Sequence, residues 1–557
     1  MGPIGQSIFF GVILCCISLS VNQDLPCAAR DLGIEGRSIV CVCNSTYCDT
    51  VTRDVPASGS YVTYTSSKSG KRFEKVSGRL NSQTGEHVTH LPACDAIFFN
   101  DFTKEDGSNG EKRREKLSEL CARNFWTTVT LQLRIDERHQ FIEGFGGSVT
   151  DAAAYNWVKL SEQTKDYFIR SYFSEDGLEY NIIRTPIGGA DFSTHPYTYN
   201  EYPENDKDLT NFTMTYEDIF LKIPMIKHIQ RTSKGEVKVM ASTWSPPVWM
   251  KTNGRITGFA QLKPEYYQTF ADYHVRFMEL YEAAEIHTWS LTTTNEPING
   301  IVPFVDFNSL GWFPSDLGRW VAQYLGPTIR NSRFNDTLIF AVDDQRYLLH
   351  VYLNGMERGD PNVMDYVDGI AVHYYGNFAP ALLLDDVHRR YNKMLLATEA
   401  CEGPMPWDIA QVKKGSWERA YRYTKNIMED LNHHMVGWID WNLCLDEKGG
   451  PNWAYNFVDA PILVFPENDE FIKQPMFYAM GHFSKFIPRG SQRITVSARS
   501  IARISNVAFI TPQGNIVMVL HNTQITDTNV IIRVTSQRTI ELIVEAESIK
   551  TIEINPN

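Results

Sequence analysis

Eight short apolar runs recur through the middle of the chain, and the segments between them are predicted to be helices. The runs lie near residues 141, 180, 237, 287, 338, 368, 394 and 435. Because each run is continuously apolar rather than alternating, we expect strands that are buried on both faces. The intervening stretches Leu262 to Ala284 and Trp417 to His433 have the amphipathic pattern of helices. Eight such units predict a parallel (β/α)8 barrel; an open doubly wound sheet is the alternative, weakened because no Gly-x-Gly-x-x-Gly turn follows a strand.

The two ends of the chain differ from its middle in their hydrophobic pattern. Short alternating stretches fill residues 27–135 and return in residues 492–555. Period-two alternation with turn residues between the stretches is typical of antiparallel strands. We therefore expect one antiparallel β-sandwich built from both ends of the chain.

The first residues read as an export signal. The apolar run 8–21 is 14 residues long, which is too short for a membrane span of about 20 residues and suits a secretory signal. We expect cleavage near residues 22–24, and a buried N-terminal helix is the alternative. Sequons at Asn44, Asn211 and Asn335 fit a glycosylated secretory protein, although such tripeptides also arise by chance.

Cysteine spacing agrees with export. Cys27, Cys41, Cys43 and Cys48 lie close together without a histidine, which favours disulfides over a zinc site. Four cysteines allow three pairings, and adjacency favours Cys27 with Cys41 and Cys43 with Cys48. We expect Cys94 and Cys121 to form a disulfide at the base of a polar surface loop. We expect Cys401 and Cys444 to be buried free thiols.

The overall charge is acidic, and the signatures of several enzyme classes are missing. The sequence has 53 Lys and Arg against 66 Asp and Glu, a net charge of −13, which argues against a nucleic-acid binder. Zinc-protease, serine-hydrolase and P-loop motifs do not occur in it. Asp343-Asp344 and His433-His434 lack a further partner at ligand spacing, so we interpret both pairs as structural and expect no metal or cofactor.

Two glutamates stand where strands of the expected barrel end. Thr294-Asn295-Glu296-Pro297 closes the fourth apolar run, and Glu399 closes the seventh. Active groups of such barrels lie at the carboxyl ends of the strands, so the two carboxyls are expected to face each other. Retaining glycosidases use two carboxyls about 5 Å apart, one as nucleophile and one as acid and then base. Asn-Glu-Pro alone is more often a turn or a helix start.

Other strand ends carry side chains suited to binding a sugar. Carboxylates, amides and aromatic rings gather there, at Asp191, Trp244, Trp249, His373, Tyr374, Tyr375, Asp440, Trp441 and Asn442. Rings stack on the apolar faces of sugars, while carboxylates and amides hold hydroxyls by directed hydrogen bonds. Taken singly, Trp244 or Tyr375 is more readily a core residue, but so many strand ends with this chemistry are hard to explain by packing.

Long stretches of the chain resemble the lysosomal acid β-glucosidase (glucosylceramidase) family. The shared motifs include CVCNSTYCDT at 41, GFGGSVTDAAA at 144, TNEP at 294, VDDQR at 342, ATEAC at 397 and GGPNWAYNFVD at 449. The resemblance covers nearly all of the mature chain. It implies a (β/α)8 barrel with a β-sandwich and a small N-terminal β-sheet strapped by two disulfides.

The same resemblance implies an activity and the residues that perform it. The activity is hydrolysis of the β-glucosidic bond of glucosylceramide with net retention, with Glu399 as nucleophile and Glu296 as acid/base. Because two nearby carboxyls resist double ionisation, one of their pKa values is expected to be raised, which suits acidic pH. Residues that match substrate contacts are Asp191, Trp244, Asn295, Tyr375, Trp441 and Asn456, and those that match residues buttressing the carboxylates are Arg184 and His373.

The resemblance further implies a lysosomal protein that works at a membrane surface. A saposin-type activator and anionic lipids are the expected partners. A homodimer is also possible on the sequence alone. Trp312-Phe313 and Tyr374 are candidate lipid contacts, with ordinary packing an equal alternative. Tyr374 stands where the family has a Trp, and Gly189-Ala190 replaces Ser-Cys before Asp191, which affects the expected shape of the rim.

We expect four regions in the chain. They are a signal peptide at 1–23, a three-stranded sheet region at 24–50 with 444–474, a β-sandwich at 51–135 with 491–557, and the barrel at 136–443 with 475–490. Two other functions stay open: a related glycosidase acting on β-xylosides, galactosides or β-1,6-glucans, and a non-catalytic protein that binds glycosphingolipid. The presence of both Glu296 and Glu399 speaks against the second, because a binding module needs no such pair.

Overall fold

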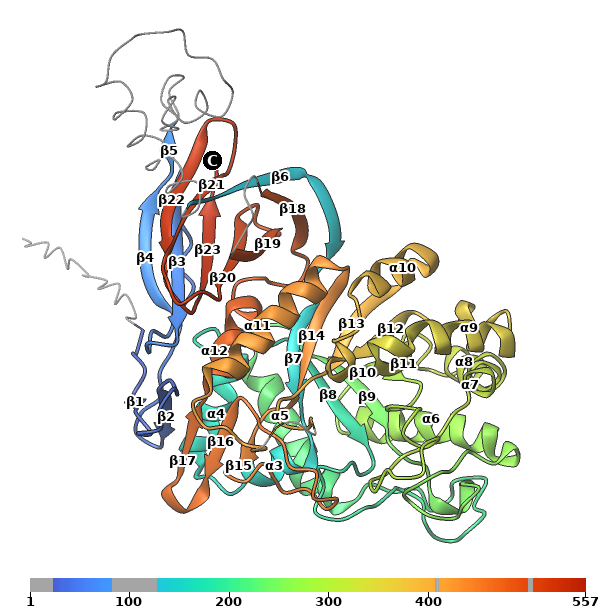
Figure 1. The fold of residues 1–557 in the computed structure, drawn as a ribbon. Coiled ribbons are helices and arrows are strands. Elements are labelled where there is room, and N and C mark those ends of the chain that lie inside the picture. The colour runs from blue at the N-terminus through green and yellow to red at the C-terminus, as the bar shows by residue number, and fades with distance from the viewer. Residues whose placement is uncertain (1–23, 83–127, 406–407, 409, 499–503) are drawn as a thin grey trace, which may run out of the picture.

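A closed barrel of eight parallel strands forms the centre of the molecule. The computed structural model describes residues 24–82, 128–405, 408, 410–498 and 504–557 (Figure 1). The strands follow one another around the barrel in chain order. They are β7 (Gly144–Ser148), β8 (Ile182–Ile187), β9 (Lys238–Thr243), β10 (Thr288–Thr292), β11 (Leu338–Gln345), β12 (Gly369–His373), β13 (Met394–Glu399) and β14 (Met435–Asn442). Each predicted apolar run supplies one strand, so the predicted (β/α)8 barrel is confirmed.

Apolar side chains fill the interior of the barrel below its polar end. The buried cluster there consists of Ile182, Met240, Phe340, Ala371, Leu396, Val436 and Ile439. These residues precede the strand ends that carry the carboxylates, amides and aromatic rings. The barrel is therefore a packed core at one end and a polar site at the other, as is usual for this fold.

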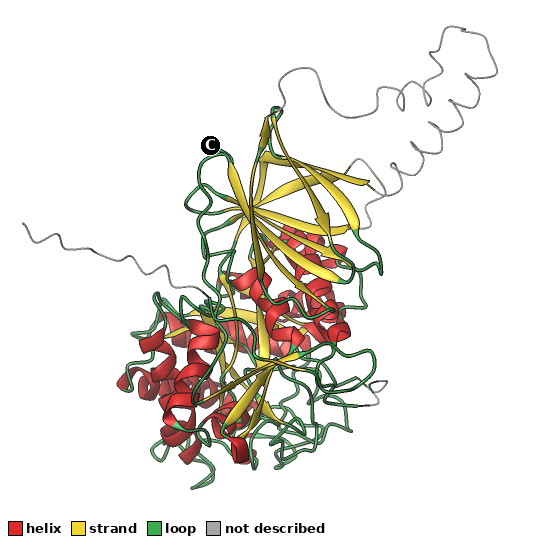
Figure 2. Cartoon of the chain, turned by 90° about the vertical axis from the view of Figure 1, so that its left-hand side faces the viewer, coloured by secondary structure: helices red, strands yellow, loops and turns green. Residues whose placement is uncertain are grey.

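Helices cover the outside of the barrel (Figure 2). They are α3 (Asp151–Trp157), α4 (Glu162–Phe173), α5 (Ile223–Thr232), α6 (Tyr267–Ala283), α7 (Pro314–Trp320), α8 (Gly326–Arg330), α9 (Leu349–Gly359), α10 (Leu382–Tyr391), α11 (Trp417–Asn432) and α12 (Pro475–Ser484). Shorter helical turns are η1 (Glu217–Lys222), η2 (Val248–Met250), η3 (Pro264–Tyr266), η4 (Val321–Leu325), η5 (Arg346–Leu348), η6 (Val363–Asp365), η7 (Tyr374–Gly376) and η8 (Pro466–Asn468). The two stretches predicted to be helical contain α6 and α11. Local sequence sets where helices begin: Thr150 and Ser416 cap α3 and α11 by accepting hydrogen bonds from backbone N–H groups.

The β-sandwich is built from both ends of the chain, as predicted. Its strands are β3 (Ser60–Ser67), β4 (Glu74–Arg79), β5 (Asn81–Ser82), β6 (Thr128–Phe141), β18 (Gln492–Ala498), β19 (Ile504–Ile510), β20 (Ile516–Asn522), β21 (Thr528–Arg533), β22 (Arg538–Val544) and β23 (Ser548–Asn555). Antiparallel pairing of β3 with β23 joins the two ends. Alternate Val, Ile and Leu side chains of these strands form its separate core.

A small sheet below the sandwich carries the disulfides. It has five strands, where we expected three: β1 (Ala29–Arg30), β2 (Val40–Asn44), β17 (Glu470–Lys473), β16 (Ile462–Phe465) and β15 (Leu445–Asp446), in that order. β1 and β15 have two residues each, too few to leave a period in the sequence. Disulfides join Cys27 to Cys41 and Cys43 to Cys48, the pairing that adjacency favours. Cys401 and Cys444 are buried and free.

Some predictions fall outside the described residues. These are the signal peptide at 1–23 and the bridge between Cys94 and Cys121, since residues 83–127 are not described. Of the sequons, Asn211 and Asn335 are exposed and Asn44 is half-buried at the end of β2. Within the described residues, no helix is long and apolar enough to cross a membrane.

Candidate active site

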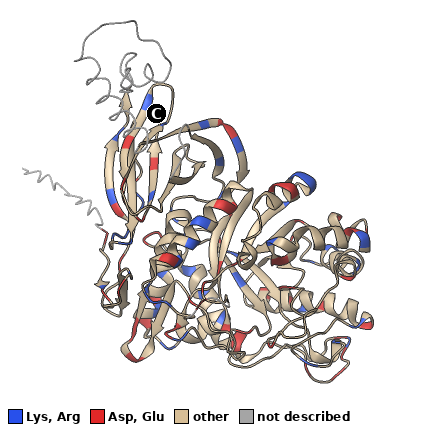
Figure 3. Cartoon of the chain, in the orientation of Figure 1, with Lys and Arg blue, Asp and Glu red and all other residues tan. Residues whose placement is uncertain are grey.

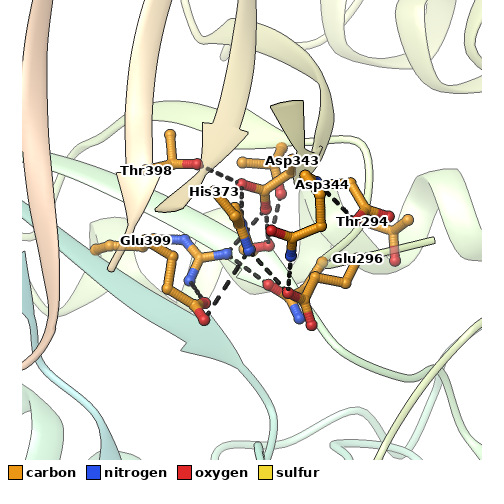
Figure 4. Close-up of polar contacts among 12 residues, drawn as sticks. Thr294, Glu296, Asp343, Asp344, His373, Thr398 and Glu399 are labelled. Carbon is orange, nitrogen blue, oxygen red and sulfur yellow. Dashed lines mark hydrogen bonds and ion pairs between the residues drawn. The ribbon is translucent and has the colours of Figure 1, made fainter. Parts of the chain in front are cut away.

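Glu296 and Glu399 meet at the polar end of the barrel, as predicted. Glu399 is the last residue of β13, and Glu296 follows β10 by four residues. One oxygen of each carboxylate and a ring nitrogen of His373 all lie within 4.8 Å of one another (Figure 4). Glu296 has a φ of 40°, which non-glycine residues rarely adopt, and its N–H donates to the carbonyl of Asp343. The backbone of β11 thus helps to hold Glu296 in place.

Glu399 is surrounded by groups that favour its charged form. Arg184 Nη1 lies 2.6 Å from Oε2, and the hydroxyl of Tyr375 donates to Oε1 at 2.9 Å. Burial raises the pKa of Glu399, and the positive charges of His373 and Arg184 oppose that rise. A carboxylate held in place by these two donors is suited to act as a nucleophile.

Glu296 is surrounded differently, by amides and an imidazole. Gln345 Nε2 donates to its Oε1 at 2.8 Å, and Asn299 Nδ2 donates to its Oε2 at 2.5 Å. His373 Nδ1 lies 3.0 Å from Oε1. Next to it, burial and the charge of Glu296 raise the pKa of Asp344 well above its usual range. Both oxygens of Glu296 are thus held by side-chain donors, which orient its carboxyl group toward the bond to be broken.

Asp343, which we expected to be structural, lies at the centre of the site. Its carboxylate accepts hydrogen bonds from Arg184, His373, Ser242 and Thr398 at 2.7–3.0 Å. Burial raises the pKa of Asp343, but the charges of Arg184 and His373 and the hydrogen bonds from His373 and Thr398 together keep that pKa far below its usual range. A shift of register in β11 between Val342 and Asp344 turns Asp343 into the barrel. The VDDQR motif is a sequence signal for this residue, but spacing alone does not give its role.

Two cations lie among the carboxylates of the site. His373 bridges Asp343 and Glu296, and its carboxylate neighbours raise its pKa to about 10 against the effect of burial. The cations Arg184 and His373 then face the anions Asp343 and Glu399. Glu296, His373 and Glu399 lie close enough together to coordinate a metal ion. A protonated His373 cannot be a ligand, however, and Arg184 adds a second positive charge, so these residues do not fit a metal site.

Predicted sugar contacts surround the carboxylates. Trp244 and Trp441 stack with ring centroids 5.2 Å apart, and the guanidinium of Arg184 lies 4.9 Å from the Trp244 ring. Asp191 Oδ2 accepts from Asn456 Nδ2 at 3.2 Å and from Asn452 Nδ2 at 3.2 Å, the latter a residue that we did not predict. Burial raises the pKa of Asp191 to about 7. Rings and polar groups of these kinds are suited to a hexose.

Asn295 also belongs to this group. Its side-chain oxygen accepts from Arg184 Nη2 at 2.7 Å, and its N–H donates to the carbonyl of Thr243. The same arginine therefore contacts Glu399, Asp343 and Asn295. Its contacts fix the positions of side chains from three other barrel strands or their ends.

Other residues at the strand ends have structural surroundings. Trp249 packs on Tyr266 and donates to a backbone carbonyl. Trp312 is 1% exposed and stacks on Trp320, so its predicted lipid contact is wrong and the packing alternative holds. Tyr374 is half-buried and donates to Glu402 at 2.6 Å. Two further candidates are buried and hydrogen-bonded to other side chains: Asp440 accepts from Tyr423, and Asn442 accepts from Thr150.

Fold and site together define a glycoside hydrolase built on a (β/α)8 barrel. The glycosyl hydrolase family 30 TIM-barrel domain matches residues 142–487, and the glycosyl hydrolase family 30 beta sandwich domain matches residues 490–552. The chain belongs to glycosyl hydrolase family 30.

Relatives of known name agree with this family. The chain is 39% identical to the lysosomal acid glucosylceramidase of Mus musculus, over 89% of both chains. It is 38% identical to putative glucosylceramidase 3 of Caenorhabditis elegans, over 90% of both. Among solved structures, SrfJ from Salmonella typhimurium has a TM-score of 0.74 at 23% identity, covering 89% of this chain and 100% of that one. That likeness shows the fold alone.

Proposed function

We propose that this chain is a retaining β-glucosidase that hydrolyses glucosylceramide to glucose and ceramide. The observation that carries the proposal is the pair of carboxylates, Glu296 and Glu399, with oxygens within 4.8 Å of one another at the mouth of a family 30 barrel. This spacing suits the short separation of retaining enzymes, about 5–5.5 Å, and not the separation of about 6.5–9.5 Å that inverting enzymes use. The likeness to the mouse glucosylceramidase supports the substrate.

In the first step Glu399 attacks the anomeric carbon of glucose. Glu296 donates its proton to the glycosidic oxygen, the bond to ceramide breaks, and a glucosyl ester of Glu399 forms. Arg184 and Tyr375 hold the attacking carboxylate. In the second step Glu296, now ionised, takes a proton from water, and the hydroxyl attacks the anomeric carbon and releases Glu399.

The sugar is held on the side of Asp191, Trp244 and Trp441. We assign Asp191 and Asn456 to hydroxyl binding, and the stacked tryptophans to the apolar face of the ring. Asn295 is assigned to the 2-hydroxyl, a contact that tightens as the oxocarbenium-like transition state forms. Arg184 and His373 position the carboxylates rather than the sugar.

The direct test is the release of glucose from glucosylceramide in anionic liposomes between pH 4 and 7. We expect a bell-shaped profile on the acid side for the wild type and none for Glu399→Gln. If glucosylceramide is not cleaved while aryl glycosides are, the natural substrate is another glycoside. Comparing aryl glucoside, xyloside and galactoside then identifies it, and labelling of Glu399 by a cyclitol epoxide would exclude a non-catalytic binding protein.

Access to a membrane lipid is part of the proposal. Large apolar side chains are exposed on loops that follow the barrel strands at the catalytic end, at Phe304, Phe313, Tyr347 and Phe378. Phe378 is 79% exposed and stacks on Tyr347. Such a rim favours contact with a bilayer or with a saposin-type activator, and anionic liposomes are expected to raise activity. The lysosome is the proposed location, in line with the name of the mouse relative.

A further inference from the structure

A cavity of about 630 Å³ lies between the barrel and the sandwich, at the end opposite the catalytic site. α10, the turn between α11 and β14, and strands β6 and β18 contribute to its wall. Its charged and titratable lining consists of Arg389, Arg493, His139, His388, His433, His434 and a single acid, Asp385. Figure 3 shows acidic and basic residues side by side on α10. Arg389 pairs with Asp386 at 2.9 Å and His433 with Asp385 at 2.9 Å, which leaves Arg493 and the other three histidines to make this cavity a candidate for an anion.

Arg493 is the strongest sign that this cavity is suited to an anion. It is 8% exposed, and its Nε donates to Gln140 Oε1 at 3.1 Å. Within the residues that the structure describes, no carboxylate lies within 4.0 Å of its guanidinium. A buried guanidinium without an anion is costly, and the planar fork of an arginine matches an oxyanion. The cavity that Arg493 lines provides the space for one.

The histidines surround the same space. The rings of His388 and His434 stack in parallel with centroids 4.0 Å apart, and the His139 ring lies 6.3 Å from His434. Asp385 is occupied by His433 at 2.9 Å and lies 3.6 Å from His434. Nδ1 of His388 is buried without a hydrogen-bond partner among the described residues. Nitrogens of parallel rings do not converge, which disfavours a metal ion and leaves them as donors to an anion.

We propose that this cavity binds a tetrahedral oxyanion, a sulfate or a phosphate monoester, between Arg493, His388 and His434, and that acidification strengthens the binding. Burial, together with the charges of His388, Arg493 and His139, lowers the pKa of His434 to about 4. Burial and Arg493 lower the pKa of His139, while Glu137 opposes this. An anion favours the charged imidazoles and raises these pKa values, so binding takes up protons and is tighter at low pH.

Titration calorimetry with sodium sulfate at constant ionic strength tests the proposal on the full-length protein. Sulfate keeps its charge between pH 5 and 7.5, so any pH dependence comes from the protein. We expect binding at pH 5 to be at least about tenfold tighter than at pH 7.5, because one linked proton gives up to tenfold per pH unit. Arg493→Gln should weaken binding at pH 5 at least about tenfold.

Two further variants keep the test informative if Arg493→Gln does not fold. His434→Asn retains a residue that tolerates the φ of 70° at this position and should reduce the pH dependence. Arg358→Gln, an exposed arginine on α9 outside the cavity, should bind sulfate as the wild type does. The proposal is wrong if the wild type does not bind sulfate at pH 5, if binding is equal at both pH values, or if folded Arg493→Gln or His434→Asn binds as the wild type does.

The oxyanion could be free or carried by a lipid headgroup. Cosedimentation at pH 5 with vesicles of phosphatidylcholine and phosphatidic acid separates the two sources. A headgroup ligand predicts that sulfate competes with the vesicles and that Arg493→Gln sediments less. A free ligand predicts equal sedimentation of both proteins while sulfate binding is lost in the variant. Either result is compatible with the site, and the calorimetric outcomes decide whether it exists.

Discussion

Arg184 and Glu399 form an ion pair inside the barrel, with 2.6 Å between Nη1 and Oε2 and both side chains buried. The same guanidinium pairs with Asp343 at 2.9 Å. One cation therefore serves two carboxylates, and His373 supplies a second positive charge next to them. Burial raises the pKa of Glu399, and these two positive charges oppose that rise.

Removing the charge of Arg184 should move the pH profile. Arg184→Gln leaves Asp343 and Glu399 short of a cation, so the pKa of Glu399 rises and the acid limb of kcat/KM shifts to higher pH. Loss of a buried partner of this kind also costs about 3–5 kcal/mol of stability. Arg184→Lys keeps the charge and should move the limb less. An acid limb that stays in place for the folded Gln variant would contradict the role of Arg184.

Glu399→Gln should abolish turnover, because the isosteric amide cannot form the glucosyl ester. We expect less than about one per cent of wild-type kcat on an activated aryl glucoside, since removing one member of a catalytic unit usually costs far more than a hundredfold. Steady-state assays, with circular dichroism as a check of folding, measure this. Higher activity in a preparation free of wild-type enzyme would count against Glu399 as nucleophile.

Glu296→Gln should affect substrates according to their leaving groups. Ceramide leaves as an alkoxide unless it is protonated, whereas dinitrophenolate leaves without a proton. We expect kcat/KM to fall by at least about a hundredfold for glucosylceramide, the usual range for general acid catalysis, and much less for dinitrophenyl glucoside. Equal losses on both substrates would show that Glu296 does more than deliver a proton.

The sequence predicts the barrel and the catalytic pair better than the centre of the site. Continuous apolar runs mark the buried strands, and Glu296 and Glu399 are found because each follows such a run. The role of Asp343 cannot be predicted in this way, because a register shift inside β11 turns this residue toward the barrel interior. The periodicity of the sequence does not indicate that shift. The predicted lipid contact of Trp312 is wrong for a related reason. A tryptophan in a predicted loop suggests a surface contact, and the sequence does not show that it stacks on Trp320.

The contribution of Asp440 to the free energy of unfolding should fall as the pH rises from 5 to 8. Burial raises the pKa of Asp440 to about 8, against a hydrogen bond from Tyr423. A raised pKa in the folded state contributes stability below the unfolded value of about 3.9, and this contribution is lost as the pH approaches 8. Asp440→Asn imitates the protonated form, so it should reduce the fall, which is on the order of a few kcal/mol. Urea unfolding at pH 5 and pH 8 measures the free energy of unfolding of each variant, with the exposed Asp208→Asn as the control. If the change in this free energy between the two pH values is the same for Asp440→Asn as for the wild type, Asp440 is not protonated in the folded state.

Phe378→Ser should separate lipid access from chemistry. Phe378 is 79% exposed beyond β12 and touches none of the catalytic side chains among the contacts described, so hydrolysis of a soluble aryl glucoside should be unchanged. If the rim enters the bilayer, losing one aromatic side chain costs about 1.5–3 kcal/mol of membrane affinity, and activity on glucosylceramide liposomes falls about tenfold or more. Ile525→Ser, an exposed apolar residue of the sandwich, is the matched control. Equal activity of Phe378→Ser and the control on liposomes would mean that glucosylceramide reaches the site without this part of the rim.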